Sequence, residues 1–201
     1  MASGAQALIA ELDASLVKRS GEQRLTMLRQ ICDLFLAYAE RCPAEQVSIF
    51  DDVMMKLLGT LPREALIELS GKLAVVDNAP ANVARRLAND DDIAIAGPFL
   101  RRSNALTDRD LAAIVAEKGA SHLKAVLSRG PIGEAVTDLL LERNDPELLS
   151  RLAANEEARF SEVGIVKLVY AAKNNKALAA IVLGRKDLPA EMLPFLQMAD
   201  A

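Results

Sequence analysis

The stretch LANDDDIAIAGPFL, residues 87–100, decides the fold class because its pattern recurs along the back half of the chain. A small apolar pair precedes Asn89, a helix start follows, and Ala96 and Leu100 lie seven and eleven residues after Asn89. The further copies are Leu127-Ser128-Arg129, Ala153-Ala154-Asn155 and Leu183-Gly184-Arg185. Recurring helix starts are typical of stacked helical pairs, which mostly serve as binding surfaces.

The copies are divergent. Apolar residues recur at the same offsets after Arg129 and Arg185, whereas Glu162 occupies the first offset after Asn155. The Asn/Arg positions are separated by 40, 26 and 30 residues. The long first interval predicts one extra helix between Asn89 and Arg129.

The composition favours helix-on-helix packing. Of 201 residues, 51% are hydrophobic and only 3% aromatic, so Leu, Ala, Val and Ile form the core and helix axes can approach closely. Short connections make successive helices antiparallel. The sequence predicts an all-α fold of antiparallel hairpins, stacked as a divergent HEAT-like repeat in an α-solenoid or a compact helical-repeat domain.

Helix starts are marked by proline and by capping residues. Proline is favoured at the first helical position, and a following acidic residue suits the positive end of the helix dipole. Asp145 is a good cap, and Thr107 with Asp110 resembles a capping box. These patterns predict helix starts near residues 43, 62, 80, 107, 131, 146 and 189.

The front of the chain differs from the back. Residues 1–79 predict a bundle or cap of four longer helices, the first with Leu8, Leu12 and Leu16 on one face. Residues 80–201 predict the divergent repeat region, joined to the bundle in one continuous domain. The wide apolar stripes of the N-terminal helices also allow a homodimer.

The charge distribution disfavours nucleic acid and membranes as partners. The net charge is −4, and residues 81–201 carry 16 basic and 17 acidic groups, so neither half is basic. No signal peptide is evident, and no uncharged apolar run approaches the ~18 residues that a membrane span needs. A cytoplasmic protein is expected.

Catalytic and metal-binding patterns are missing from the sequence. Cys32 and Cys42 are expected on one helix, too far apart for a disulfide, as reduced and partly buried thiols; a redox pair is the alternative. The one histidine, His122, is expected at the surface or at a helix start, with Ser121 beside it. No nucleotide-binding or nucleophile motif occurs. We expect no cofactor, no metal and no enzymatic activity.

Three features between residues 89 and 102 allow two interpretations each. Asp90 to Asp92 could hold a cation, or could cap a helix with Asn89 or Asp90 as the cap residue. Gly97-Pro98 could form the floor of a groove for a partner's backbone, or a helix kink. Arg101-Arg102 could bind an anion near Arg85-Arg86, or could offset the dipole at a helix end.

Several stretches together resemble a known family. They run through residues 25–36, 46–53, 86–98, 134–138 and 158–161, and residues 89–98 are the most specific part. The chain resembles, over nearly its whole length, the bacterial and mainly alphaproteobacterial family named domain of unknown function 2336. The resemblance implies an all-helical cytoplasmic protein, and it implies no activity or site residue.

These observations together predict a non-enzymatic helical-repeat module that binds another protein in a regulatory or scaffolding role. The alternative is binding of nucleic acid or a phosphorylated ligand through a local arginine face. The candidate binding residues belong to the repeat turns and their neighbours: Asn89, Arg101, Arg102, Arg129 and Arg185.

Overall fold

The computed structural model describes residues 20–59 and 61–197. These residues form twelve α-helices and two 3₁₀ helices but no β-strand, and one isolated bridge pairs Ile132 with Ala158. The predicted all-α class is therefore confirmed. The chain divides into two compact units, residues 1–106 and 107–201, and each is described by itself. The predicted helix with Leu8, Leu12 and Leu16 lies outside the described residues.

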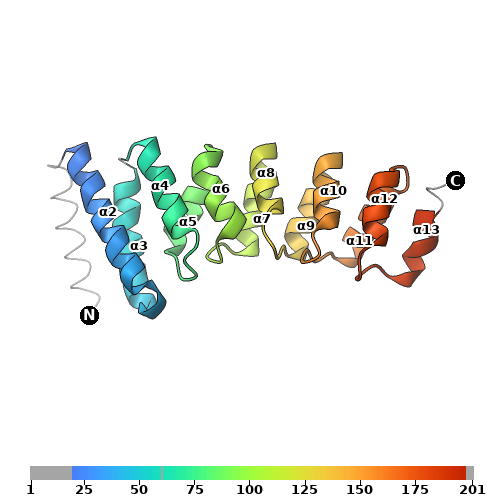
Figure 1. Cartoon of the computed structure of the whole chain (residues 1–201), viewed down its shortest axis with the longest axis horizontal. Coiled ribbons are helices and arrows are strands. Elements are labelled where there is room, and N and C mark those ends of the chain that lie inside the picture. Colours follow the sequence, from blue (N-terminus) through green and yellow to red (C-terminus); the bar gives the residue numbers. More distant parts are fainter. Residues whose placement is uncertain (1–19, 60, 198–201) are drawn as a thin grey trace. The chain divides into compact units, whose positions relative to one another are not determined.

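The first unit has two layers of helices (Figure 1). In one layer α4 packs against both α2 and α6, and in the other α3 packs against α5. The bounds are α2 (Gly21–Tyr38), the 3₁₀ helix Ala39–Arg41, α3 (Ala44–Leu58), α4 (Arg63–Leu73), α5 (Ala81–Ala88) and α6 (Ile93–Arg102). The boundary expected after residue 79 falls inside this unit, because α5 and α6 pack against helices that precede it.

The core of the first unit follows the apolar periodicity of its helices. Leu28, Cys32 and Phe35 of α2 are buried, and the ring centroids of Phe35 and Phe50 lie 5.3 Å apart. Asp51 of α3 is a charged residue that lies in this core, with only 5% of its surface exposed. Its carboxylate accepts hydrogen bonds of 2.9 Å from the backbone N–H groups that open α5. Asp51 therefore caps a helix that lies about thirty residues further along the chain.

The second unit also has two layers (Figure 1). Neighbouring helices pack in the order α7, α9, α11, α13 in one layer and α8, α10, α12 in the other. The bounds are α7 (Asp108–Glu117), α8 (Ala120–Leu127), α9 (Glu134–Glu142), α10 (Pro146–Ala154), α11 (Glu162–Ala172), α12 (Lys176–Leu183), the 3₁₀ helix Ala190–Met192 and α13 (Leu193–Gln197).

The predicted helix starts are correct to within a few residues, but the role assigned to proline is wrong at most of them. Only Pro146 occupies the first helical position. Pro43, Pro62 and Pro80 are N-cap residues, whose carbonyl groups accept the first helical bonds. The Thr107 capping box forms as predicted.

The repeated pattern ends one helix and precedes the next in each of its copies. It ends α5, α8, α10 and α12 in turn. The first interval contains three helices, α6 to α8, and the later intervals contain two each, so the extra helix is confirmed.

Candidate functional site

The turn residues of the second unit are fastened to one another. Asn155, at the end of α10, donates hydrogen bonds from Nδ2 to the carbonyl oxygens of Arg129 (3.1 Å) and Gly130 (2.9 Å). Its Oδ1 accepts a 2.9 Å bond from the backbone N–H of Glu157. The Nδ2 group of Asn155 thus holds the turn that follows α8, whereas its Oδ1 atom stabilises the turn to which Asn155 itself belongs.

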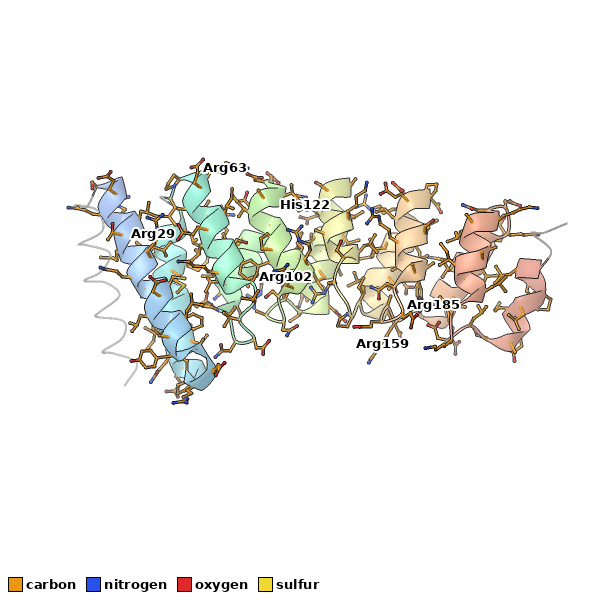
Figure 2. The ribbon with its side chains drawn as sticks, in the orientation of Figure 1. Arg29, Arg63, Arg102, His122, Arg159 and Arg185 are labelled. Atoms are coloured by element: carbon orange, nitrogen blue, oxygen red, sulfur yellow. The ribbon has the colours of Figure 1, made fainter. Side chains whose placement is uncertain are left out.

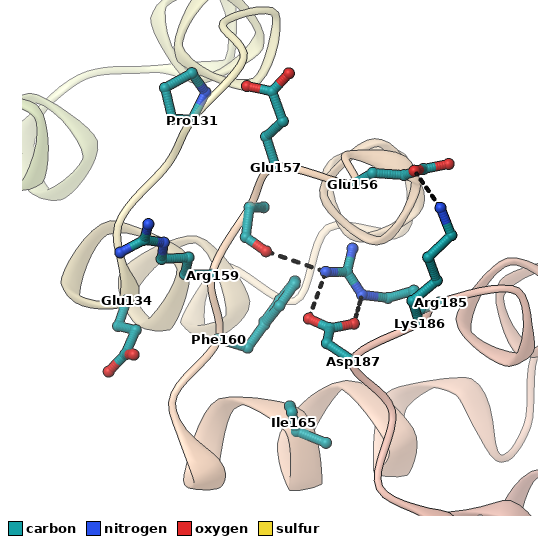
Figure 3. A pocket seen from close by; sticks show the side chains of 11 residues that line it. Pro131, Glu134, Glu156, Glu157, Arg159, Phe160, Ile165, Arg185, Lys186 and Asp187 are labelled. Carbon is teal, nitrogen blue, oxygen red and sulfur yellow. Dashed lines mark hydrogen bonds and ion pairs between the residues drawn. The ribbon is translucent and has the colours of Figure 1, made fainter.

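Arg185 repeats this contact one turn further on (Figure 3). Nη1 donates to the carbonyl oxygens of Ala153 (2.9 Å) and Asn155 (2.8 Å), and Nη2 donates to that of Ala158 (3.0 Å). Nε and Nη2 also donate to the two carboxylate oxygens of Asp187, at 2.8 and 2.7 Å. The turns at Arg129, Asn155 and Arg185 are therefore joined in series.

These bonds use all five N–H groups of the Arg185 guanidinium. The side chain is 6% exposed, and its guanidinium carbon lies 4.6 Å from the centroid of the Phe160 ring. The hydrogen bond from Arg185 holds the pKa of Asp187 below its usual range. The proposed ligand-binding role of Arg185 needs correction, because no donor of this side chain is left for a ligand.

Arg129, the equivalent residue of the preceding turn, is only partly accessible. Burial lowers the pKa of its guanidinium, and the nearby charge of Asp108 partly opposes that effect. An arginine remains charged under such a shift. Arg129 is thus held within the second unit near the start of α7, and it does not project as an isolated anion-binding group.

An open groove of about 630 Å³ runs beside these turns (Figure 3). Its lining residues come from three consecutive turn segments and from the first turns of α9 and α11: Pro131, Glu134, Glu156, Glu157, Ala158, Arg159, Phe160, Ile165, Arg185, Lys186 and Asp187. Lys186 lies 3.7 Å from Glu156, but both side chains are more than 80% exposed, so this ion pair contributes little. The groove carries both acidic and basic side chains beside the apolar Phe160 and Ile165. This lining suits contact with a polar surface better than acid–base chemistry.

In the first unit the aspartate run caps a helix. Asp92 is the N-cap of α6, and its carboxylate accepts a 2.9 Å hydrogen bond from the N–H of Ala94. Asp92 also forms an ion pair with Arg63, and the hydrogen bond from Arg63 lowers the pKa of Asp92. Asp90 accepts bonds from the N–H of Asp92 (3.0 Å) and from Arg86 (3.2 Å). The capping interpretation is confirmed, but the cap residue is Asp92. Asn89 instead ends α5, with Nδ2 donating to the Arg85 carbonyl.

The two arginine pairs of this unit are not brought together. Arg85 and Arg86 belong to the last turn of α5, whereas Arg101 and Arg102 end α6, which is roughly 15 Å long. Figure 2 marks Arg102 at this end. Arg101 folds back over Gly97, where an added Cβ would lie 2.7 Å from its Nη1. The space above Gly97 is therefore occupied by Arg101 and is no groove floor for a partner.

The histidine and cysteine predictions are confirmed in part. His122 lies at the start of α8, as expected, but it is only 4% exposed. Cys32 and Cys42 are free thiols, although Cys42 lies beyond the end of α2 and so does not share a helix with Cys32. Burial raises the pKa of the Cys32 thiol to about 11, which makes it a poor nucleophile at neutral pH.

One surface feature was missed from the sequence. Val163, Val166 and Tyr170 of α11 are 62%, 49% and 77% exposed. At 100° per residue they occupy one face of the helix, opposite the buried residues Leu168 and Ala172. We call these three residues the α11 stripe. Nearly every residue of α11 is apolar or small, so periodicity could not tell which face is exposed.

The described residues contain neither a metal-binding cluster nor a helix that could span a membrane. Residues 20–59 and 61–197 contain no group of three or more His, Cys, Asp or Glu side chains that could together hold a metal ion. Over the same residues, every helix falls short of the length and apolar character that crossing a membrane requires.

The fold and these surfaces define an all-helical protein whose turns are fastened to one another. Residues 95–196 match the model of the family described as an uncharacterised protein conserved in bacteria, domain of unknown function 2336. The chain belongs to this family. The match is narrower than the resemblance suggested and leaves Asn89 outside, but it includes the fastened turns and the α11 stripe. No curated protein and no solved structure matches the chain significantly.

Proposed function

We propose that this chain is a non-enzymatic helical-repeat module, HEAT-like in its arrangement, that binds another protein in a regulatory or scaffolding role in the cytoplasm. The α11 stripe is the observation that carries the proposal. Exposed apolar side chains that gather on one helix face mark interaction sites, and tyrosine is enriched among residues that dominate binding energy.

The repeat arrangement is supported by the serial hydrogen bonds of the turns. Asn155 holds the turn before it, and Arg185 holds the turn of Asn155. Each contact spans 25 to 32 residues, which is about one helical pair. A unit in which each helical pair is fixed to its neighbour presents its outer helix faces rigidly, as a binding scaffold requires.

The arginine-face alternative has weaker support. The N–H groups of Arg185 donate to other groups of the protein, Arg86 pairs with Asp90, and Arg85 donates to Asn82. Arg101 and Arg102 end α6 with exposed side chains, and a dipole effect explains them there. The hydrogen bond from Arg185 lowers the pKa of Asp187, so this groove carboxylate is a poor candidate for a general acid.

Affinity purification from the native host tests the proposal. The bait is compared with Val166→Ser/Tyr170→Ala, which removes apolar surface without touching the core. Leu34→Ser/Tyr38→Ala on α2 is the matched control, because these side chains are 52% and 61% exposed. We expect a protein, identified by mass spectrometry, that the wild type and the control enrich and the α11 variant loses at least tenfold. Equal recovery of every enriched protein by all three baits would count against the proposal.

The expected homodimer stays a prediction. Light scattering that gives only the monomer mass at high concentration would refute it.

A further inference from the structure

The lysines of the described residues fall into two groups. Of the eight lysines in residues 20–59 and 61–197, six interact with another residue: Lys72, Lys124, Lys167 and Lys186 pair with carboxylates, and Lys56 and Lys118 also have partners. Within the same residues the side chains of Lys173 and Lys176 have no hydrogen-bond or ion-pair partner, and both residues are exposed. They flank the turn between α11 and α12.

Lys173 extends the α11 stripe. It follows Tyr170 by three residues and keeps helical backbone angles, so Val163, Val166, Tyr170 and Lys173 lie within an arc of about 80°. The spacing of three, four and three residues is that of positions that face a partner helix in a coiled coil. The lysine on the opposite flank of α11, Lys167, already pairs with a carboxylate of the protein itself, that of Glu142 in α9.

We propose that the α11 stripe, with Lys173 and Lys176, docks an amphipathic α-helix of a partner protein whose apolar face is flanked by aspartate or glutamate at one end. This inference rests on the proposed function and names the chemistry of the partner. Valine and tyrosine supply the apolar contact, and the two lysines select an acidic helix and fix its direction, because charge complementarity sets register and orientation.

The test uses the full chain and two synthetic helical peptides. Both peptides carry the same leucines at heptad spacing; one has glutamates and the other lysines at the flanking positions of its last turn. Binding is followed by fluorescence anisotropy at low and high salt, and hydrogen exchange locates the site. We expect the acidic peptide to bind at least tenfold tighter, to weaken with salt, and to protect α11.

Charge reversal makes the test specific. Lys173→Glu/Lys176→Glu should lose the preference for the acidic peptide. The control, Arg159→Glu/Lys186→Glu, changes the net charge equally on the groove of Figure 3 and should retain that preference. Circular dichroism confirms that both variants fold.

Three results overturn the inference. They are equal binding of both peptides, an unchanged preference in Lys173→Glu/Lys176→Glu, and no peptide binding with binding to anionic phospholipid vesicles instead. If a native partner still depends on Val166 and Tyr170 but not on the lysines, the inference fails while the proposed function stands. If the acidic peptide binds but no native partner depends on the stripe, the proposed function fails.

Discussion

Replacing Arg185 with alanine should destabilise the second unit by about 4 kcal/mol. Three hydrogen bonds to backbone carbonyl groups contribute about 1 kcal/mol each. The contact with Phe160 adds about 1 kcal/mol. The pair with Asp187 adds less than about 1 kcal/mol, because that carboxylate is 46% exposed and screened by water. A loss of this size is a large fraction of the stability of a small domain.

Urea unfolding followed by circular dichroism measures the loss, and hydrogen exchange assigns it to residues 107–197. Arg185→Lys should recover only part of it, because one ammonium group cannot reach carbonyls and carboxylate at once. Arg151→Ala is the matched control: Arg151 is half-exposed in an ion pair with Glu147, and its loss should cost less than about 0.5 kcal/mol. A cost below about 1 kcal/mol for Arg185→Ala, or equal costs for both arginines, would refute the reasoning.

The pH dependence gives a second check on Arg185. Its hydrogen bond lowers the folded-state pKa of Asp187, so this interaction stabilises the fold above the unfolded-state pKa of about 4. The stabilisation is lost as the pH falls through the lowered folded-state pKa. The difference in unfolding free energy between wild type and Arg185→Ala should therefore shrink below about pH 4, and a difference that grows there would contradict the assignment.

Three further predictions concern single side chains. Asp51→Ala should lower the free energy of unfolding, measured in urea, by about 2–3 kcal/mol, because two N–H groups at the start of α5 lose their buried acceptor. A decrease below about 0.5 kcal/mol would show that water replaces this acceptor. Asn144 has a φ of 50°, so Asn144→Gly should be neutral or stabilising and Asn144→Ala destabilising by about 1 kcal/mol; the reverse order in thermal unfolding would be inconsistent with this backbone. In thiol titration with an aromatic disulfide at pH 8, Cys42 should react in the native protein and Cys32 only after unfolding; rapid reaction of two thiols would exclude the buried position of Cys32.

Local patterns predict the helices well because caps and breaks act over a few residues. Thr107 with Asp110 and Asp145 with Pro146 define helix starts on their own. Contacts over long sequence distances are different. Asp51 meets its partners 31 and 32 residues away, and Arg185 meets its carbonyl partners 27 to 32 residues away. Which turn lies beside which is decided by packing, so the sequence could mark Arg185 as special but could not assign its task.

Because the turns are bonded to one another, the helix faces are better candidates for a binding surface than the turns. The repeated Asn/Arg position was predicted to bind a partner, but the Nδ2 group of Asn155 and three N–H groups of Arg185 donate to the preceding turn. A residue that fixes neighbouring helical pairs is constrained by the fold and is a poor place for specificity to vary. The outer faces of the helices carry no such constraint. The α11 stripe is such a face, and the two lysines beside it have no partner among residues 20–59 and 61–197. Recognition by this protein should therefore follow changes on helix faces, while changes in the turns should act first on stability.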